Sequence, residues 1–174
     1  PAADRDRAQF PRLAAAAGRL LAERGGPRVA ALELGGWDTH VFQPNAIQGP
    51  LRALDAGIGE LRTALGGDWA RTAVLVITEF GRTARGNGNS GTDHGTAGVA
   101  FLVGGAVAGG RVLADWPGLA PDRLFENRDL RPTADLRSAA KGVLRDHLRL
   151  PETAVVAAFP GSEDAPAMRG LVSA

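Results

Sequence analysis

Residues 29–40 read VAALELGGWDTH, and the rest of the chain can be interpreted around this stretch. Its first half, residues 29–34, is short and mostly apolar, which predicts a buried strand. Two glycines follow and allow a sharp backbone turn, because glycine adopts φ values that other residues resist. Asp38 and His40 come next, at the carboxyl end of the expected strand, where α/β folds place ligand chemistry. The pattern fits equally well a plain turn with a capping aspartate and a surface histidine.

Buried runs alternate with amphipathic segments along the chain, and this alternation predicts an α/β fold with parallel strands in one sheet. The clearest strand reads TAVLVIT over residues 72–78 and is apolar on both faces, as a central parallel strand should be. Thr133 is expected to cap the last helix. The expected strands are residues 29–34, 73–78 and 99–103, and the expected helices are residues 11–23, 48–65 and 134–148.

Length and composition predict a single soluble domain over residues 1–174, since this length supports a real hydrophobic core. The net charge of +1 and the absence of a basic run argue against a nucleic-acid partner. No apolar run reaches the ~20 residues that a membrane span needs. The chain begins at Pro1 without an initiator methionine, so we expect a processed or truncated piece. Residues 1–9 and 161–174 are expected to be loosely ordered.

Polar residues follow two further buried runs. Glu79 comes directly after residues 73–78, where a carboxylate is costly unless it is paired or binds a cation. Arg82 could be that partner, in an ordinary salt bridge. Asp93 and His94 follow a glycine- and asparagine-rich loop, which lacks the lysine of a phosphate-binding loop.

These polar residues form a candidate metal site. If the strands are neighbours in one parallel sheet, their carboxyl ends meet at one edge. Mixed histidine and carboxylate ligands suit Zn²⁺, Mn²⁺ or a related divalent ion, and the chain has no cysteine to supply a thiolate. The third histidine, His147, is expected near the end of a helix and away from the site. The predicted metal ligands are Asp38, His40, Glu79, Asp93 and His94.

Six short motifs together resemble the bacterial "domain of unknown function 1501" family, over about Leu20 to Phe159. They are GGWDTH at 35–40, TEFGRT at 78–83, GTDHG at 91–95, GG at 104–105, GGR at 109–111 and DLR at 135–137. The family looks like a branch of the alkaline phosphatase and sulfatase superfamily. The resemblance therefore implies a three-layer α/β/α fold with a mostly parallel sheet and metals at strand ends. It also implies twin-arginine export to the periplasm or cell envelope.

Within this resemblance, Asp38 and His40 are similar to the superfamily's Asp and His ligand pair. His94-Gly95-Thr96 resembles the motif that supplies the last metal-binding histidine. Glu79-Phe80 stands where the superfamily carries an Asp-His pair, so one histidine ligand is missing. The superfamily's Ser or Thr nucleophile belongs to an upstream half, so this chain resembles the carboxyl-terminal part of such an enzyme.

The sequence thus predicts a metal-dependent hydrolase-like domain that acts on small phosphate or sulfate esters. Arg82 is the residue expected to bind the anionic substrate. Without the upstream nucleophile, we expect the isolated chain to be catalytically silent. The alternative is a non-catalytic envelope binding or scaffold protein with a degenerate alkaline phosphatase-like site.

Overall fold

The computed structural model describes residues 2–173, with residues 2–4 described by their backbone alone. The chain forms two compact units. The first unit runs as far as Trp69 and includes Arg85–Asp93, and the second consists of Ala70–Ala84 and the chain from His94 onward. None of the described helices is both long and apolar enough to cross a membrane.

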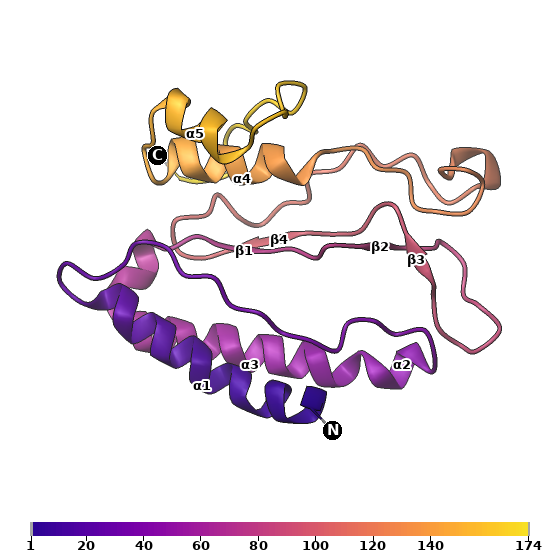
Figure 1. Cartoon of the computed structure of the whole chain (residues 1–174), viewed down its shortest axis with the longest axis horizontal. Helices are drawn as coiled ribbons and strands as arrows, with labels where there is room; N and C mark the ends of the chain where they lie inside the picture. The colour runs from indigo at the N-terminus through magenta and orange to yellow at the C-terminus, as the bar shows by residue number, and fades with distance from the viewer. Residues whose placement is uncertain (1, 174) are drawn as a thin grey trace. The chain divides into compact units, whose positions relative to one another are not determined.

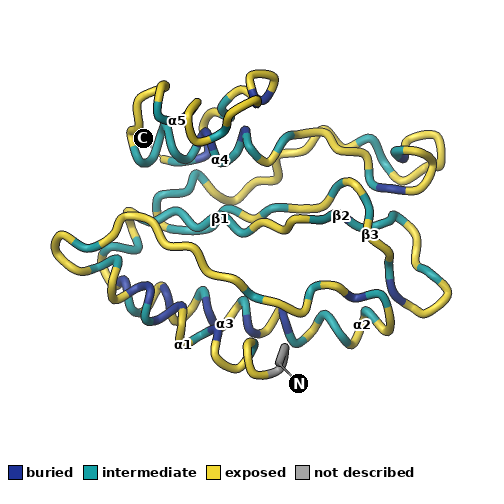
Figure 2. The backbone as a smooth tube through the Cα atoms, viewed as in Figure 1, coloured by how far each residue is buried: buried dark blue, intermediate teal, exposed yellow. Residues whose placement is uncertain are grey.

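The first unit is built on two long helices, α1 (Ala2–Ala22) and α3 (Gln48–Leu65), which pack side by side (Figure 1). Their buried positions are mostly small residues, seen as dark blue stretches in Figure 2. The Phe10 ring of α1 lies directly on Gly57 of α3, where a Cβ atom would stand 2.3 Å from Cε1 of the ring. A short helix, α2 (Gln43–Ala46), precedes α3, and a 3-10 helix, η1 (Gly66–Arg71), follows it.

The predicted helices are present, with two changes. α3 covers the predicted residues 48–65, whereas α1 starts well before the predicted residue 11 and encloses Pro11. α4 (Leu136–Asp146) is shorter than predicted. Its cap is Asp135 and not Thr133, because the Asp135 carboxylate accepts a hydrogen bond of 2.8 Å from the backbone N–H of Arg137.

The second unit contains an irregular β-hairpin. Strand β1 (Val74–Val76) pairs antiparallel with β4 (Phe101–Val103), and β2 (Gly81–Arg82) pairs antiparallel with β3 (His94–Gly95). Residues 77–80 separate the two ladders on the outgoing arm and residues 96–100 on the returning arm. Between the two ladders, the returning arm is therefore one residue longer than the outgoing arm.

The predicted parallel arrangement of residues 73–78 and 99–103 is wrong, since β1 and β4 run antiparallel. A parallel pair needs a crossover of a dozen or more residues, usually a helix. The residues between β2 and β3 form turns and bends and contain no helix, so the chain simply reverses. Within the described part of the chain, residues 29–34 pair with no strand. What the structure supports is the coarser class, a mixed helix-and-strand α/β protein.

The carboxyl-terminal part of the second unit packs α4 against the segment 161–173. Lys141 of α4 is buried, and its ammonium group donates hydrogen bonds to the carbonyls of Ser162 (2.6 Å) and Ala165 (2.8 Å). Ser162, Ala165 and Leu171 are themselves buried. Helix α5 (Glu152–Ala158) lies between α4 and this segment in the sequence, and a 3-10 helix, η2 (Pro121–Arg123), precedes α4. The segment 161–173 thus supplies part of the buried interior of this unit.

Candidate metal centre

The turn that holds Asp38 and His40 starts at Gly36. Gly36 has a φ of 96°, in the left-handed region that glycine tolerates best. Beyond it, side chains alternate: Thr39 is only 5% exposed, whereas the side chains of Asp38 and His40 are 54% and 41% exposed. The turn therefore presents the carboxylate and the imidazole on its accessible side, as the sequence spacing predicts for an extended backbone.

The loop Arg85–Asp93 is attached to this turn by backbone hydrogen bonds. The N–H of Thr92 donates to the carbonyl of Thr39 (3.3 Å), and those of Phe42 and Gln43 donate to the carbonyls of Asn89 (3.0 Å) and Ser90 (2.9 Å). The loop approaches so closely that a Cβ atom at Gly91 would lie 2.0 Å from the carbonyl oxygen of His40. Glycine at position 91 is therefore a steric requirement of this contact.

His40 lies between two carboxylates. Its Nε2 is 2.9 Å from Oδ1 of Asp38, and its Nδ1 is 3.1 Å from Oδ1 of Asp93. A carboxylate can only accept, so each ring nitrogen needs a proton or a metal ion to make a favourable contact. The donor set fits a divalent cation, because imidazole nitrogen and carboxylate oxygen are ordinary ligands of Zn²⁺ and Mn²⁺.

Asn87 connects the loop to both members of this contact. Its Nδ2 donates to Oδ1 of Asp93 (2.9 Å) and to the carbonyl of His40 (3.0 Å). Its Oδ1 accepts from the backbone N–H groups of Asn89 (2.9 Å) and Gly91 (3.0 Å). Sequence reasoning missed Asn87, because an asparagine in a glycine-rich loop is typical of any turn.

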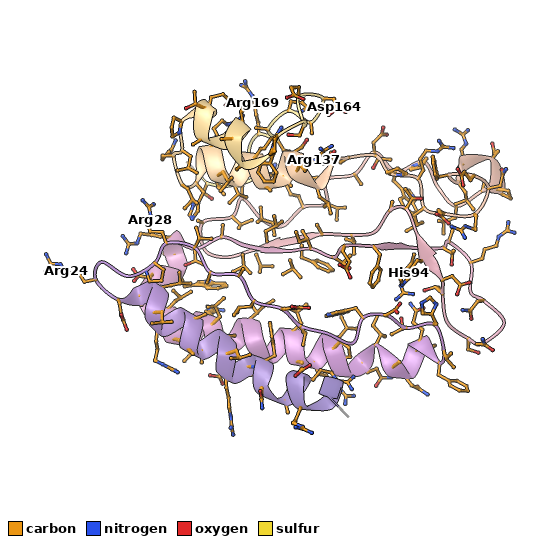
Figure 3. The ribbon with its side chains drawn as sticks, viewed as in Figure 1. Arg24, Arg28, His94, Arg137, Asp164 and Arg169 are labelled. Atoms are coloured by element: carbon orange, nitrogen blue, oxygen red, sulfur yellow. The ribbon has the colours of Figure 1, made fainter. Side chains whose placement is uncertain are left out.

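The remaining predicted site residues belong to the second unit. Arg82 pairs with His94 across the β2–β3 ladder, and Glu79 is exposed two residues before β2. The His94 imidazole, labelled in Figure 3, stacks on the Phe80 ring with centroids 4.6 Å apart and an angle of 8° between the planes. The Arg82 guanidinium carbon lies 4.7 Å from the centroid of the same ring. Phe80 thus contacts both functional candidates of this ladder, a role that sequence reasoning did not assign.

Within each unit, the structure brings some of the predicted site residues together. Asp38, His40 and Asp93 come together in the first unit. Arg82 and His94 come together around Phe80 in the second unit.

Comparisons with known proteins agree with the motif resemblance. A family model described as "Protein of unknown function (DUF1501)" matches residues 2–158, which is most of the chain. Neither the comparison with curated proteins nor the comparison with solved structures gave a match. On the extent of the family match, the chain belongs to the DUF1501 family of proteins of unknown function.

Proposed function

We propose that this chain carries the divalent-metal centre of a hydrolase-like domain for phosphate or sulfate esters. The observation that carries the proposal is the position of the His40 imidazole between the carboxylates of Asp38 and Asp93. Two acidic groups around one imidazole concentrate negative charge at a half-exposed position, where a cation is favoured. A divalent ion there would supply Lewis-acid chemistry toward a phosphoryl or sulfuryl oxygen.

The three residues have different roles in this proposal. Asp38 and Nε2 of His40 form the ligand pair. Asp93 faces the other ring nitrogen, the position of a carboxylate that orients a metal-binding histidine and raises its basicity. We therefore assign Asp93 to the orientation of His40, although the sequence suggested a direct ligand. Glu79 and His94 stay ligands predicted from the sequence.

Arg82 is the proposed substrate-binding residue. Its guanidinium group lies over the Phe80 ring, and this stacking restricts the plane of the guanidinium. The N–H groups at the edge of a planar guanidinium match the oxygens of a phosphate or sulfate group. The proposal thus assigns anion recognition to the β2–β3 ladder.

The wider setting of the proposal comes from the motif resemblance. It comprises a three-layer α/β/α fold of the alkaline phosphatase type, zinc or manganese as the ion, and twin-arginine export to the bacterial periplasm or envelope. In that setting the nucleophile comes from outside residues 1–174.

A second candidate, a non-catalytic envelope binding or scaffold protein, is favoured by the hydroxyl groups near His40. Thr39 is buried, and the hydroxyl of Thr92 donates to Oε1 of Gln43 (2.7 Å). Ser90 is exposed at a positive φ of 57°. A nucleophile must be positioned and free to attack, whereas Thr39 is buried and the Thr92 hydroxyl already donates to Gln43.

Calorimetric titration of the purified chain with Zn²⁺ and Mn²⁺ tests the metal centre. We expect one ion per chain, with binding at least ~100-fold weaker in His40→Ala, since a direct ligand is worth more than the ~10–100-fold of an outer-shell partner. His147→Ala is the matched control, because His147 is the C-cap residue of α4. Binding that survives His40→Ala would overturn the proposal.

The same samples test the catalytic half of the proposal with aryl phosphate and aryl sulfate substrates. We expect no turnover from the isolated chain with either ion. Turnover in the common enzymatic range of roughly 1–10³ s⁻¹, lost in His40→Ala, would contradict the assignment of the nucleophile to a region outside this chain.

A further inference from the structure

The Asn87 side chain uses every hydrogen-bonding position that an amide offers. Its two N–H groups donate to Asp93 and to the His40 carbonyl, and its oxygen accepts two backbone N–H groups. This pattern admits only one orientation of the amide. Rotation by half a turn would place the amide oxygen against the oxygens of Asp93 and His40, and the NH₂ group against two N–H donors.

The oxygen and the nitrogen of this amide bind different parts of the molecule. The oxygen end closes the local turn at Asn89 and Gly91 in its own loop, as asparagine does in many turns. The nitrogen end reaches out of the loop to His40, 47 residues earlier in the chain, and to Asp93. Only the nitrogen end contacts the residues of the candidate centre, and a turn alone does not need it.

Oδ1 of Asp93 accepts a hydrogen bond from the Asn87 amide and also faces Nδ1 of His40. The Asn87 amide nitrogen lies 2.9 Å from this oxygen, and Nδ1 of His40 lies 3.1 Å from it. A carboxylate with half of its surface exposed would otherwise rotate among several positions, since exposed side chains change rotamer readily. The bond from Asn87 keeps the oxygen that faces His40 in place.

We propose that Asn87 is a positioning residue of the metal centre, which fixes Asp93 against His40 and thereby fixes the imidazole for metal binding. The effect on metal affinity rests on the proposed function, whereas the effect on the His40–Asp93 contact does not. Outer-shell partners of metal ligands typically contribute 10–100-fold to affinity, and Asn87 falls in this class.

Two substitutions separate the ends of the amide. Asn87→Asp keeps an oxygen for the N–H groups of Asn89 and Gly91 but replaces the donor that faces Asp93 with a second acceptor. Asn87→Ala removes both ends. The matched control is Asn89→Ala, because Asn89 is exposed in the same loop and joins this network through its backbone.

Zn²⁺ titration of the full chain gives the first readout. We expect binding about 10-fold weaker or more in both Asn87 variants, and unchanged in Asn89→Ala. Far-ultraviolet circular dichroism like that of the wild type would show that Asn87→Asp is folded, because the variant retains the acceptor of the turn. Binding in Asn87→Asp that is as tight as in the wild type, or tighter, would overturn the proposal.

A double-mutant cycle with Asp93→Ala gives the readout that a purely structural role would not produce. If Asn87 acts through Asp93, Asn87→Ala should weaken binding by less than about threefold in the Asp93→Ala background, since coupled residues are not additive. Equal losses in both backgrounds would show that Asn87 only supports the loop.

NMR of the His40 side chain without metal distinguishes failure of this inference from failure of the proposed function. We expect the ¹⁵N shift of Nδ1 to change in Asn87→Asp and Asp93→Ala and to stay unchanged in Asn89→Ala. If the wild type binds no metal but these shifts change, the proposed function fails and the positioning role stands. An unchanged Nδ1 shift in Asn87→Asp overturns the positioning role, whether or not metal binds.

Discussion

The contact between Phe10 of α1 and Gly57 of α3 predicts opposite effects for two neighbouring glycines. A Cβ atom at Gly57 would lie 2.3 Å from Cε1 and 2.6 Å from Cδ1 of the buried Phe10 ring. These distances are far below van der Waals contact, so the ring or the helix must move. At Gly59, two residues further along α3, nothing lies within 4 Å of the added atom.

The magnitudes follow from two opposing terms. Replacing glycine with alanine inside a helix stabilises it by about 1 kcal/mol. Overpacking a well-packed contact costs about 1–3 kcal/mol. Gly59→Ala should therefore raise the free energy of unfolding by about 1 kcal/mol, and Gly57→Ala should change it by between about 0 and −2 kcal/mol. The difference between the variants isolates the packing term, because the helix term is common to both.

Urea unfolding followed by far-ultraviolet circular dichroism measures both values. Phe10→Leu provides the control, because a smaller side chain leaves room for the new methyl group. In that background the gap between the two alanine variants should shrink. Equal stabilisation by Gly57→Ala and Gly59→Ala in the wild-type background would refute the packing of Phe10 on Gly57.

Three further predictions concern both units. Lys141→Met should lower the free energy of unfolding by about 1–3 kcal/mol, because two buried carbonyls lose their charged donor; an unchanged urea midpoint would contradict this. Hydrogen bonds from neighbouring arginines hold the pKa values of Asp135 and Asp146 below the usual 3.8. The unfolded state thus binds protons more readily, so the stability that these carboxylates contribute is fully present above pH 3.8 and falls as the pH drops through their lowered pKa values. Asparagine at both positions should flatten this part of the stability profile, and an unaltered profile would show that the two pairs contribute nothing. Gly91→Ala should weaken Zn²⁺ binding about 10-fold, because the added methyl group forces the loop away from His40. Gly88→Ala is the control and should bind Zn²⁺ like the wild type, because nothing lies within 4 Å of the added atom. Equal Zn²⁺ affinities of the two variants would disprove the close approach of the loop to His40.

The helices could be predicted from the sequence because their evidence is local. Apolar spacing at three and four residues located α3 over its observed range and indicated α1 and α4. The direction of strand pairing is not local. Residues 73–78 and 99–103 have the composition of buried strands in either direction, and the helix-free loop between β2 and β3 settles the choice by reversing the chain.

For the candidate centre, too, the sequence predicted the local part and not the contacts between distant residues. Asp38 and His40 are neighbours in the chain, so their spacing in an extended turn already indicates a shared side. Asp93 reaches His40 only because the loop Arg85–Asp93 is attached to the turn by backbone bonds and by Asn87. Those bonds depend on the absence of a side chain at Gly91, which a glycine-rich sequence alone does not distinguish from flexibility.

X-ray absorption at the zinc edge, on the wild type and on His40→Ala, tests the central claim most directly. The claim is that His40 binds a divalent ion through its imidazole. For the wild type it predicts bound zinc with nitrogen and oxygen ligands at about 2.0–2.2 Å and the outer-shell scattering of an imidazole ring. For His40→Ala it predicts loss of bound zinc. A wild-type chain without zinc, or identical spectra from both proteins at equal zinc content, would contradict the account.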